Sequence, residues 1–372
     1  MHQKHPKLAR PTTDHYARTD VALVGSTCAV MDGLIDEWQS LNPEYRTRTI
    51  IGDHGEPVNG QLFQIGNKRF YTPNVDRGEY DERLEGLRYD LALVNGNHYP
   101  AARQIVFVDP AKAGTLERRR EQLTDVLAVI LCPGAEGMPD WLTEDLGRQP
   151  VQPPVCRLEQ ATENVLPLLK NLLGSRVPAL KSLVLIGGQS RRMGARKADL
   201  VYRNGQTEAE RMVAICERIT PGRVHLSVAD SEQNGVGDYP RIEDRFLGLG
   251  PAGAISSAML HDPDAAWLVV ACDLPLLDRA TVADLVAARR PNLYATAYRR
   301  PGERFPEPLV AIYEPRAYQR FLQYLSMGYA CPRKVLINSD AHVLDAADDA
   351  PFTNANTPEE RAAVLDILAT QR

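Results

Sequence analysis

The fold of the second half of the chain is decided by residues 183–197, which read LVLIGGQSRRMGARK. An apolar strand leads into two glycines, and a polar turn with two arginines, a third glycine and a lysine follows. Glycines let backbone N–H groups approach a phosphate with no Cβ in the way. Arg192 and Lys197 add positive charge to the same turn, so the stretch predicts a strand followed by a triphosphate-binding loop. It is not a Walker A loop, because the G-x-x-x-x-G-K-[ST] spacing is absent.

Outward from this loop, short apolar runs alternate with amphipathic stretches along the whole chain. Runs of Val, Ile and Leu predict strands at residues 20–24, 48–51, 91–94, 105–108 and 126–131, and again at 182–186, 223–228, 267–271, 293–298 and 342–344. Helical spacing marks residues 158–173, 208–219, 280–288 and 315–325. Strands that are apolar throughout suit burial on both faces. The pattern predicts an α/β protein with mostly parallel sheets flanked by helices.

The length and one proline-rich segment predict two domains. At roughly 150 residues per domain, 372 residues suit two. The segment QPVQPP at residues 149–154 ends the first periodic block, and the helix after it is expected to stop at Gly174. Residues 175–179 are expected to link this helix to the next strand. We therefore predict domains at residues 1–177 and 178–372.

Composition narrows the class of protein. The net charge of −5 disfavours non-specific nucleic-acid binding. The sequence contains no run of 18 apolar residues, so no membrane span is expected. The six cysteines form no C-x-x-C pair, which argues against zinc and predicts reduced, mostly buried thiols. The N-terminus lacks an apolar signal core. A cytoplasmic protein without nucleic-acid or membrane partners is expected.

The loop is followed in order by four further segments of the second half. They are RIED with GPAGA at residues 241–254, WLVVACDLPLL at 267–277, PLVAIY at 308–313 and FTNANTPEE at 352–360. Together with the loop they resemble the molybdenum cofactor guanylyltransferases, within the wider sugar-nucleotidyltransferase-like superfamily. The resemblance covers about 190 residues and implies a Rossmann-like nucleotidyltransferase domain.

The resemblance implies transfer of GMP from GTP to the phosphate of molybdenum cofactor. It assigns Mg²⁺ to Asp273, which follows a strand at the edge where parallel sheets place ligands. Nucleotide contacts would come from Leu185, Ile186, Gly187, Gly188, Lys197, Ser227, Asp244 and Asp273. Arg192 and Lys197 would neutralise the departing pyrophosphate. Proteins of cofactor synthesis and molybdoenzymes are further candidate partners.

Some positions depart from the family pattern, and the acceptor side carries few motifs. Ile186 stands where a small residue is usual and is expected to crowd the loop, and Arg196 stands where an acidic residue is frequent. Cations at Arg304, Arg333 and Lys334 could meet the phosphate of the pterin, but exposed solubilising charges are an equal interpretation.

The first half begins like a nucleotide-binding domain, with VALVGSTC at residues 21–28, but no Gly-Lys-Ser/Thr follows. Three later segments of this half resemble the molybdopterin-guanine dinucleotide adaptor GTPases. They are YDLALVNGNH at residues 89–98, QIVFVD at 104–109 and DVLAVI at 125–130. Asn95 replaces the acid expected near Mg²⁺. This predicts a degenerate adaptor-like domain without GTPase activity. His54 and His98 are expected to be loop histidines, not metal ligands.

Three other functions stay open at this point. The relatives that use CTP tend to carry LAAG where this chain has Leu185–Gly188, and one glycine is all that favours guanine. A sugar-1-phosphate nucleotidyltransferase would share the loop. A non-catalytic cofactor carrier would fit the departures at Ile186 and Arg196, although Arg192, Lys197 and Asp273 are all present.

Overall fold

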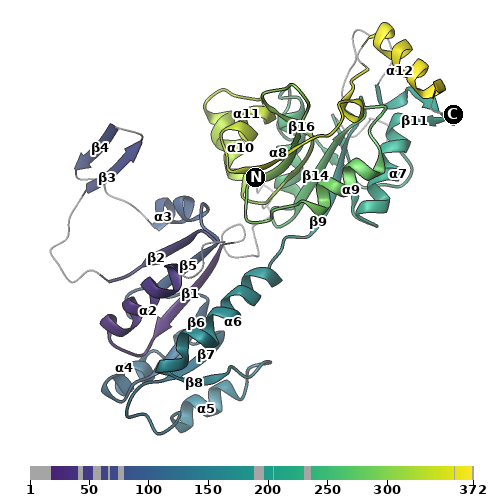
Figure 1. Cartoon of the computed structure of the whole chain (residues 1–372). Coiled ribbons are helices and arrows are strands. Elements are labelled where there is room, and N and C mark those ends of the chain that lie inside the picture. Colours follow the sequence, from purple (N-terminus) through teal and green to yellow (C-terminus); the bar gives the residue numbers. More distant parts are fainter. Residues whose placement is uncertain are drawn as a thin grey trace, which may run out of the picture. The chain divides into compact units, whose positions relative to one another are not determined.

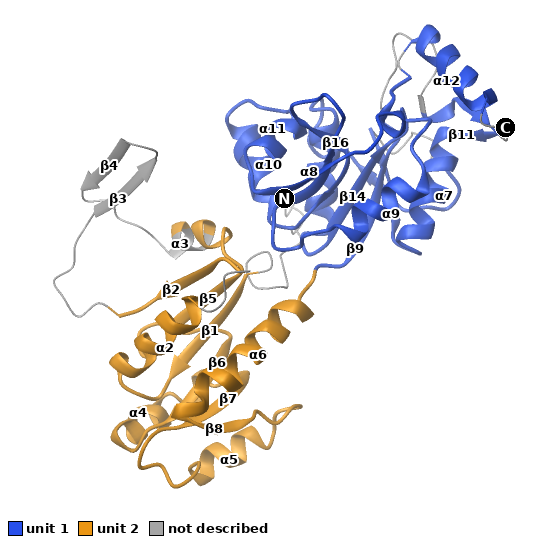
Figure 2. Cartoon of the chain, viewed as in Figure 1, with its two compact units in different colours: residues 1–12, 178–372 blue, residues 13–177 orange. Residues whose placement is uncertain are grey.

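The computed structural model describes most of the chain. The described ranges are residues 18–40, 45–52, 60–65, 68–73, 79–187, 197–203, 205–229, 236–355 and 357–370, with the backbone only at 60–65, 68–73, 79, 80, 82, 83 and 197. The chain divides into two compact units (Figure 2). Unit 2 comprises residues 13–177, and unit 1 contains residues 178–372.

Unit 2 is built on a six-stranded parallel sheet with the order β2-β5-β1-β6-β7-β8. Its strands are β1 (Thr19–Val24), β2 (Thr47–Ile50), β5 (Leu91–Asn95), β6 (Arg103–Val108), β7 (Val126–Leu131) and β8 (Val155–Arg157). An antiparallel hairpin of β3 (Gly60–Ile65) and β4 (Lys68–Pro73) lies outside this sheet. The central strands are apolar along their whole length because both faces are covered.

Helices cover both faces of the unit 2 sheet (Figure 1). They are α2 (Cys28–Ser40), α3 (Glu79–Gly86), α4 (Ala113–Arg118), α5 (Asp140–Leu146) and α6 (Ala161–Ser175), with short 3₁₀ turns η1 (Pro110–Lys112), η2 (Arg120–Gln122) and η3 (Leu158–Gln160). Helices α2 and α6 pack on the face that carries Leu23 and Phe107, and α4 and α5 pack on the face that carries Val24 and Val106. The indole N–H of Trp38 in α2 donates to Thr162 at 3.0 Å, which ties the first pair together.

Unit 1 has a seven-stranded mixed sheet with the order β13-β12-β9-β14-β16-β15-β17. Its strands are β9 (Leu180–Leu185), β12 (Val224–Val228), β13 (Arg241–Glu243), β14 (Ala266–Ala271), β15 (Ala295–Arg299), β16 (Pro306–Tyr313) and β17 (Ala341–Asp345). Only β16 runs antiparallel to its neighbours, so the sheet is mostly parallel. A small hairpin of β10 (Val201–Arg203) and β11 (Gln206–Thr207) precedes the first long helix.

Two layers of helices enclose the unit 1 sheet (Figure 1). They are α7 (Glu208–Ile219), α8 (Pro251–His261), α9 (Arg279–Ala287), α10 (Ala317–Ser326), α11 (Pro332–Ile337) and α12 (Pro358–Thr370), with 3₁₀ turns η4 (Lys197–Asp199) and η5 (Ala350–Phe352). Helices α7 and α9 contribute to the core that contains Val184, Leu268 and Val270. Helix α8 packs against β9, β12 and β14 and is itself covered by α10. The predicted α/β class, with mostly parallel sheets flanked by helices, is confirmed.

Two local predictions are wrong. Helix α6 does not stop at Gly174 but runs through it to Ser175, where the Arg176 N–H bonds the Leu173 carbonyl. Gly174 has no positive φ, so it lacks the left-handed conformation by which a glycine ends a helix. Of the six free cysteines only Cys132, Cys216 and Cys272 are buried, and Cys331 is exposed.

In the part of the chain that the structure describes, no helix is long and apolar enough to cross a membrane.

Candidate functional site

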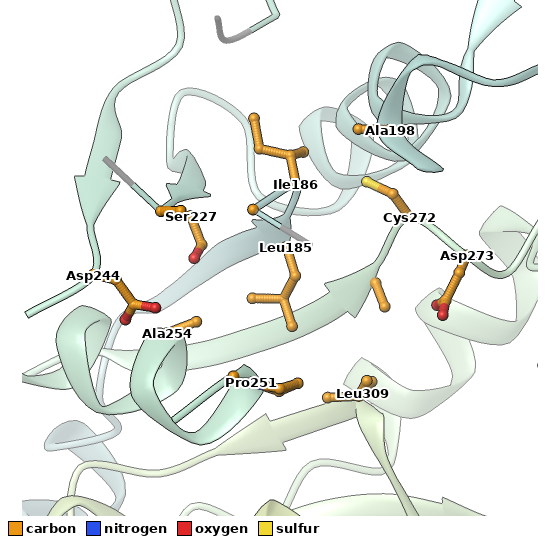
Figure 3. Close-up of a pocket in the computed structure, with 14 residues that line it drawn as sticks. Leu185, Ile186, Ala198, Ser227, Asp244, Pro251, Ala254, Cys272, Asp273 and Leu309 are labelled. Atoms are coloured by element: carbon orange, nitrogen blue, oxygen red, sulfur yellow. The ribbon is translucent and has the colours of Figure 1, made fainter. Parts of the chain in front are cut away.

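A pocket of about 240 Å³ opens at the carboxyl ends of β9, β12 and β14, in front of the N-terminus of α8 (Figure 3). Parallel pairing places Leu185 beside both Ser227 and Ala271, so the residues after these three strands meet at one edge. The lining residues are Leu185, Ile186, Gly187, Ala198, Ser227, Ala229, Asp244, Gly250, Pro251, Ala254, Ala271, Cys272, Asp273 and Leu309. A mostly apolar lining with a few polar groups is typical of a small-molecule site.

The polar groups lie at opposite ends of this pocket. Figure 3 shows Ser227 and Asp244 on one side and Asp273 on the other, with Leu185 between them. This separation suits a ligand that is polar at both ends and flat or apolar in the middle. The sequence-predicted residues Leu185, Ile186, Gly187, Ser227, Asp244 and Asp273 all line the pocket. Their contacts with a nucleotide stay predictions.

The other predicted loop residues are described only in part. Gly188 and Arg192 lie outside the described residues, as do Arg196 and His54. Lys197 begins η4, and of this residue the structure describes the backbone alone. Ile186 is 2% exposed, and its side chain packs into the core with Val184 and Ala198.

The backbone at Gly187 passes very close to the segment after β12. A Cβ at Gly187 would lie 3.1 Å from the Ala229 nitrogen, which is tighter than ordinary van der Waals contact. The Ile186 N–H donates to the Ser227 carbonyl at 3.2 Å, so the two strand ends are also hydrogen-bonded. A larger residue here would push the two strand ends apart by a few tenths of an ångström, so glycine favours this close contact between β9 and β12.

Asp273 is half-buried and sits in a loop that other elements hold in place. Its carbonyl accepts a hydrogen bond from the Ala355 N–H at 3.1 Å. Arg211 of α7 donates to the carbonyls of Leu274 and Leu277 at 2.8 and 2.6 Å. Arg211 is in turn paired with Glu208 at 2.7 Å. The loop that carries the carboxylate is thus fixed from behind by a buried ion pair.

Sequence reasoning missed Arg211, because a charged residue on an amphipathic helix ordinarily faces solvent. Both partners are buried, with side chains 10% and 1% exposed. The carbonyls of the CDLPLL turn need donors, since a buried turn must have its backbone groups satisfied. No pattern in the sequence links a position on α7 to a turn more than sixty residues later.

Asp244 follows β13 and is held on two sides. Its N–H donates to the Val228 carbonyl at 3.0 Å, and its Oδ1 lies 3.1 Å from the Ser257 hydroxyl. Burial raises the pKa of the Asp244 carboxyl, and the hydrogen bond from Ser257 partly opposes that rise. In the same pocket, burial raises the pKa of the Cys272 thiol well above its ordinary value, so Cys272 is not a ready nucleophile.

The cations named for the acceptor side lie outside the pocket lining. Arg333 is 3.8 Å from Glu307, and the Lys334 ammonium lies 3.8 Å from the centre of the Tyr329 ring. Arg304 is exposed and lies over the ring of Phe305. Burial raises the pKa of Glu307, and the N–H of Leu309, a lining residue, opposes the rise.

The carboxyl edge of the unit 2 sheet is organised differently. Helix α2 begins at Cys28, with only three residues between it and the end of β1, and Met31 is fully buried in the core. The Asn95 amide donates to Asp32 at 2.8 Å, and the Ser26 hydroxyl donates to Asp109 at 2.7 Å. His98 lies 3.4 Å from the Cys28 sulfur. Within the described ranges, no three His, Cys, Asp or Glu residues form a metal-binding group.

Replacing Arg211 with alanine is expected to lower the free energy of unfolding of unit 1 by about 3–5 kcal/mol. The change leaves Glu208 buried and unpaired and removes the donors to two loop carbonyls. Urea denaturation followed by circular dichroism measures it. The matched control is Arg218→Ala on the exposed face of the same helix, expected to stay within about 0.5 kcal/mol of the parent. Equal stability of the two variants would contradict the assignment.

Comparison with known proteins places the chain in a family. A family model described as the MobA-like NTP transferase domain matches residues 182–356. A molybdenum cofactor biosynthesis bifunctional protein of Synechocystis sp. (strain ATCC 27184 / PCC 6803 / Kazusa) is 34% identical over 186 residues, which cover 49% of this chain and 52% of that protein. The molybdenum cofactor guanylyltransferase of Shewanella sp. (strain MR-4) is 33% identical over 190 residues, covering 49% of this chain and 93% of that protein.

The chain spans about half the length of the bifunctional relative. A solved structure of molybdopterin-guanine dinucleotide biosynthesis protein A from Archaeoglobus fulgidus is similar at 22% identity and a TM-score of 0.42, covering 51% of this chain and 99% of that one. The match to the Shewanella enzyme covers nearly that whole protein, and the domain model spans the strands that line the pocket. The chain belongs to the molybdenum cofactor guanylyltransferase family.

Proposed function

We propose that the chain transfers GMP from GTP to the phosphate of molybdenum cofactor and releases pyrophosphate. The observation that carries the proposal is the single pocket in which residues from four of the five sequence motifs meet (Figure 3). The names of the family members support guanine as the base and the molybdenum cofactor as the acceptor.

The reaction exchanges one phosphorus–oxygen bond for another. An oxygen of the pterin phosphate attacks the α-phosphorus of GTP, and the bond from that phosphorus to pyrophosphate breaks. A phosphate monoester has a second pKa near 6, so it is largely ionised at neutral pH. The attacking group therefore needs no protein base, and the protein contributes positioning and charge stabilisation.

Each end of the pocket has a role in this proposal. Ser227 and Asp244 would receive the nucleoside, and the backbone N–H groups of residues 185–188 would hold the phosphates. Arg192 and Lys197 would neutralise the leaving pyrophosphate. Ser227 is 4% exposed and lies at the carboxyl end of β12, so the strand places its side chain at the edge of the pocket.

Mg²⁺ fits the donor chemistry at Asp273. Magnesium is commonly bound by one or two carboxylates together with substrate phosphates, so a full protein cage is not required. Asp273 is half-buried and follows a strand whose six residues are all buried, which gives a rigid support. When bound, the ion would offset the phosphate charge. The side chain of Asp273 would hold it, and Arg211 would keep the loop in place.

The nucleotide is tested by incubating the full chain with molybdenum cofactor, Mg²⁺ and each nucleoside triphosphate in turn. We expect mass spectrometry to detect the guanine dinucleotide form of the cofactor and GTP to be turned over in preference to CTP. Preferential use of CTP would show that the chain is a cytidylyltransferase for the same cofactor and would overturn the assignment of guanine. Turnover of sugar 1-phosphates in place of the cofactor would indicate the third activity, and no pyrophosphate release with any pair would favour a carrier.

Asp273→Ala is expected to lower turnover by roughly 10²-fold or more, because it removes the carboxylate proposed to hold the metal. Pyrophosphate release measures the rate, and titration of Mg²⁺ shows whether the requirement for the ion has changed. Asp284→Ala, an exposed aspartate on α9, is the matched control and should leave the rate unchanged. Wild-type activity in the Asp273 variant would remove the metal role from this residue.

For unit 2 we propose a degenerate adaptor-like domain that holds or delivers the cofactor and does not hydrolyse GTP. Where a phosphate loop would carry its lysine and hydroxyl, the chain has Met31 in the core and Asp32 bonded to Asn95. A hollow of about 510 Å³ beside Asp109 is lined by the further acids Glu117 and Glu136, and none of the described residues that line it is a Lys or Arg. Such a lining disfavours a triphosphate.

Separating the chain near residue 177 tests this role. Each unit has its own core, so both pieces are expected to fold. Residues 1–177 should release no phosphate from GTP, and residues 178–372 should bind nucleotide but use the cofactor less efficiently. The reason is the loss of an effective concentration on the order of millimolar that a short linker provides. GTP hydrolysis by the first piece, or undiminished turnover by the second, would contradict the respective half of the proposal.

A further inference from the structure

Ser257 lies behind the pocket and is fully enclosed. It stands on α8, one turn after Gly253, with 2% of its surface exposed. The Arg245 N–H donates to its hydroxyl oxygen at 2.8 Å. The hydroxyl proton is shared between the Gly253 carbonyl at 2.7 Å and Asp244 Oδ1 at 3.1 Å. One buried side chain therefore joins the helix to two consecutive residues of the Asp244 loop.

Gly253 brings the same loop against the same turn of the helix. A Cβ at this position would lie 2.4 Å from the Phe246 carbonyl oxygen and 3.2 Å from Asp244 Oδ1. No real side chain tolerates the first distance, so only glycine permits this approach. The loop from Asp244 to Phe246 is pressed onto α8 and hydrogen-bonded there.

The Asp244 carboxylate consequently has two different oxygens. Oδ1 faces Ser257, while Oδ2 has no hydrogen bond to any residue that the structure describes. Asp244 lines the pocket together with Ser227, on the side away from Asp273 (Figure 3). Its backbone N–H is fixed to Val228, so only the side-chain torsions remain to be set.

We propose that Ser257 is a positioning residue that holds one oxygen of Asp244 against α8 and thereby presents the other to the nucleotide. The inference rests on the proposed function, because it assumes that a nucleoside occupies this end of the pocket. Without the Ser257 hydroxyl the carboxylate gains alternative rotamers and loses a hydrogen bond to its charged form. The loss falls on nucleotide binding, since Ser257 and Asp244 lie away from Asp273 and the phosphates.

The chain offers a matched control one residue away. Ser256 is also on α8 and is 0% exposed, but its hydroxyl has no hydrogen-bond partner within the described part of the chain. Ser256→Ala also removes one buried hydroxyl oxygen from α8, but it leaves the contacts of Asp244 unchanged. A difference between the two serine variants therefore reports the contact with Asp244 and not the loss of a buried hydroxyl.

The test is calorimetric titration of the full chain with Mg²⁺–GTP. We expect Ser257→Ala to weaken binding about 10-fold, the loss of one hydrogen bond to a charged group, and Ser256→Ala to change it less than 2-fold. At saturating GTP, Ser257→Ala should keep the parent kcat within about 2-fold. Ser257→Cys, which keeps the size but offers a weak donor, should shift the affinity in the same direction if the alanine variant does not fold.

A double-mutant cycle shows whether Ser257 acts through Asp244. Asp244→Ala should weaken binding at least as much as Ser257→Ala, and the double variant should bind like Asp244→Ala within about 2-fold. Parent-like affinity in both Ser257 variants, or a Ser257 effect that persists fully without Asp244, overturns the inference alone. A parent chain that binds no GTP overturns it together with the proposed function.

Discussion

The parallel pairing of β9 with both β12 and β14 is the constraint on which the rest of unit 1 depends. It aligns Leu185 with Ser227 and Ala271, so three chain segments leave the sheet at one level. The close contact of Gly187 with Ala229 keeps the first two together. The lining residues of the pocket lie at or just after the ends of these strands, just after β13, at the start of α8, in β16 or in η4. If this register slipped by one residue, the side chains would exchange faces and the pocket would lose its polar ends.

The sequence predicted the parts of this arrangement that are local. Strands buried on both faces are continuous apolar runs, and β7, β12 and β14 begin within one residue of the expected positions. Asp273 was predicted from the family resemblance and from its place just after an apolar strand, where parallel sheets place ligands. The structure places it in the lining of the pocket, and its role as a metal ligand stays a prediction. Helix α7 has the bounds that its amphipathic spacing predicted. In the structure a capping box between Thr207 and Glu210 marks its start.

The sequence did not predict the features whose structure or role depends on residues far away in the chain. Strand β13 is three residues long with a single buried side chain, so it has no apolar run, and only pairing with β12 makes it a strand. Arg211 and Ser257 look like an ordinary helical charge and an ordinary small residue. Their importance comes from carbonyls and a carboxylate that the fold brings to them. In the same way, Gly174 has the right residue type for a helix end but lacks the conformation that would make it one.

The two units differ in how far the polar groups at the edge of the sheet are already hydrogen-bonded within the protein. Both edges carry polar side chains just after buried strands. In unit 2, the side chain of Asn95 is hydrogen-bonded to Asp32, and that of Ser26 is hydrogen-bonded to Asp109. These polar groups bond one another instead of water, so a ligand would have to break those hydrogen bonds in order to bind. In unit 1, Ser257 takes up only one oxygen of Asp244, and burial already raises the pKa of that carboxyl. Keeping a half-buried carboxylate charged with only one oxygen hydrogen-bonded raises the free energy of the empty pocket. A ligand that donates a hydrogen bond to the second oxygen lowers that free energy. That difference in free energy is what an edge must retain in order to recognise a ligand.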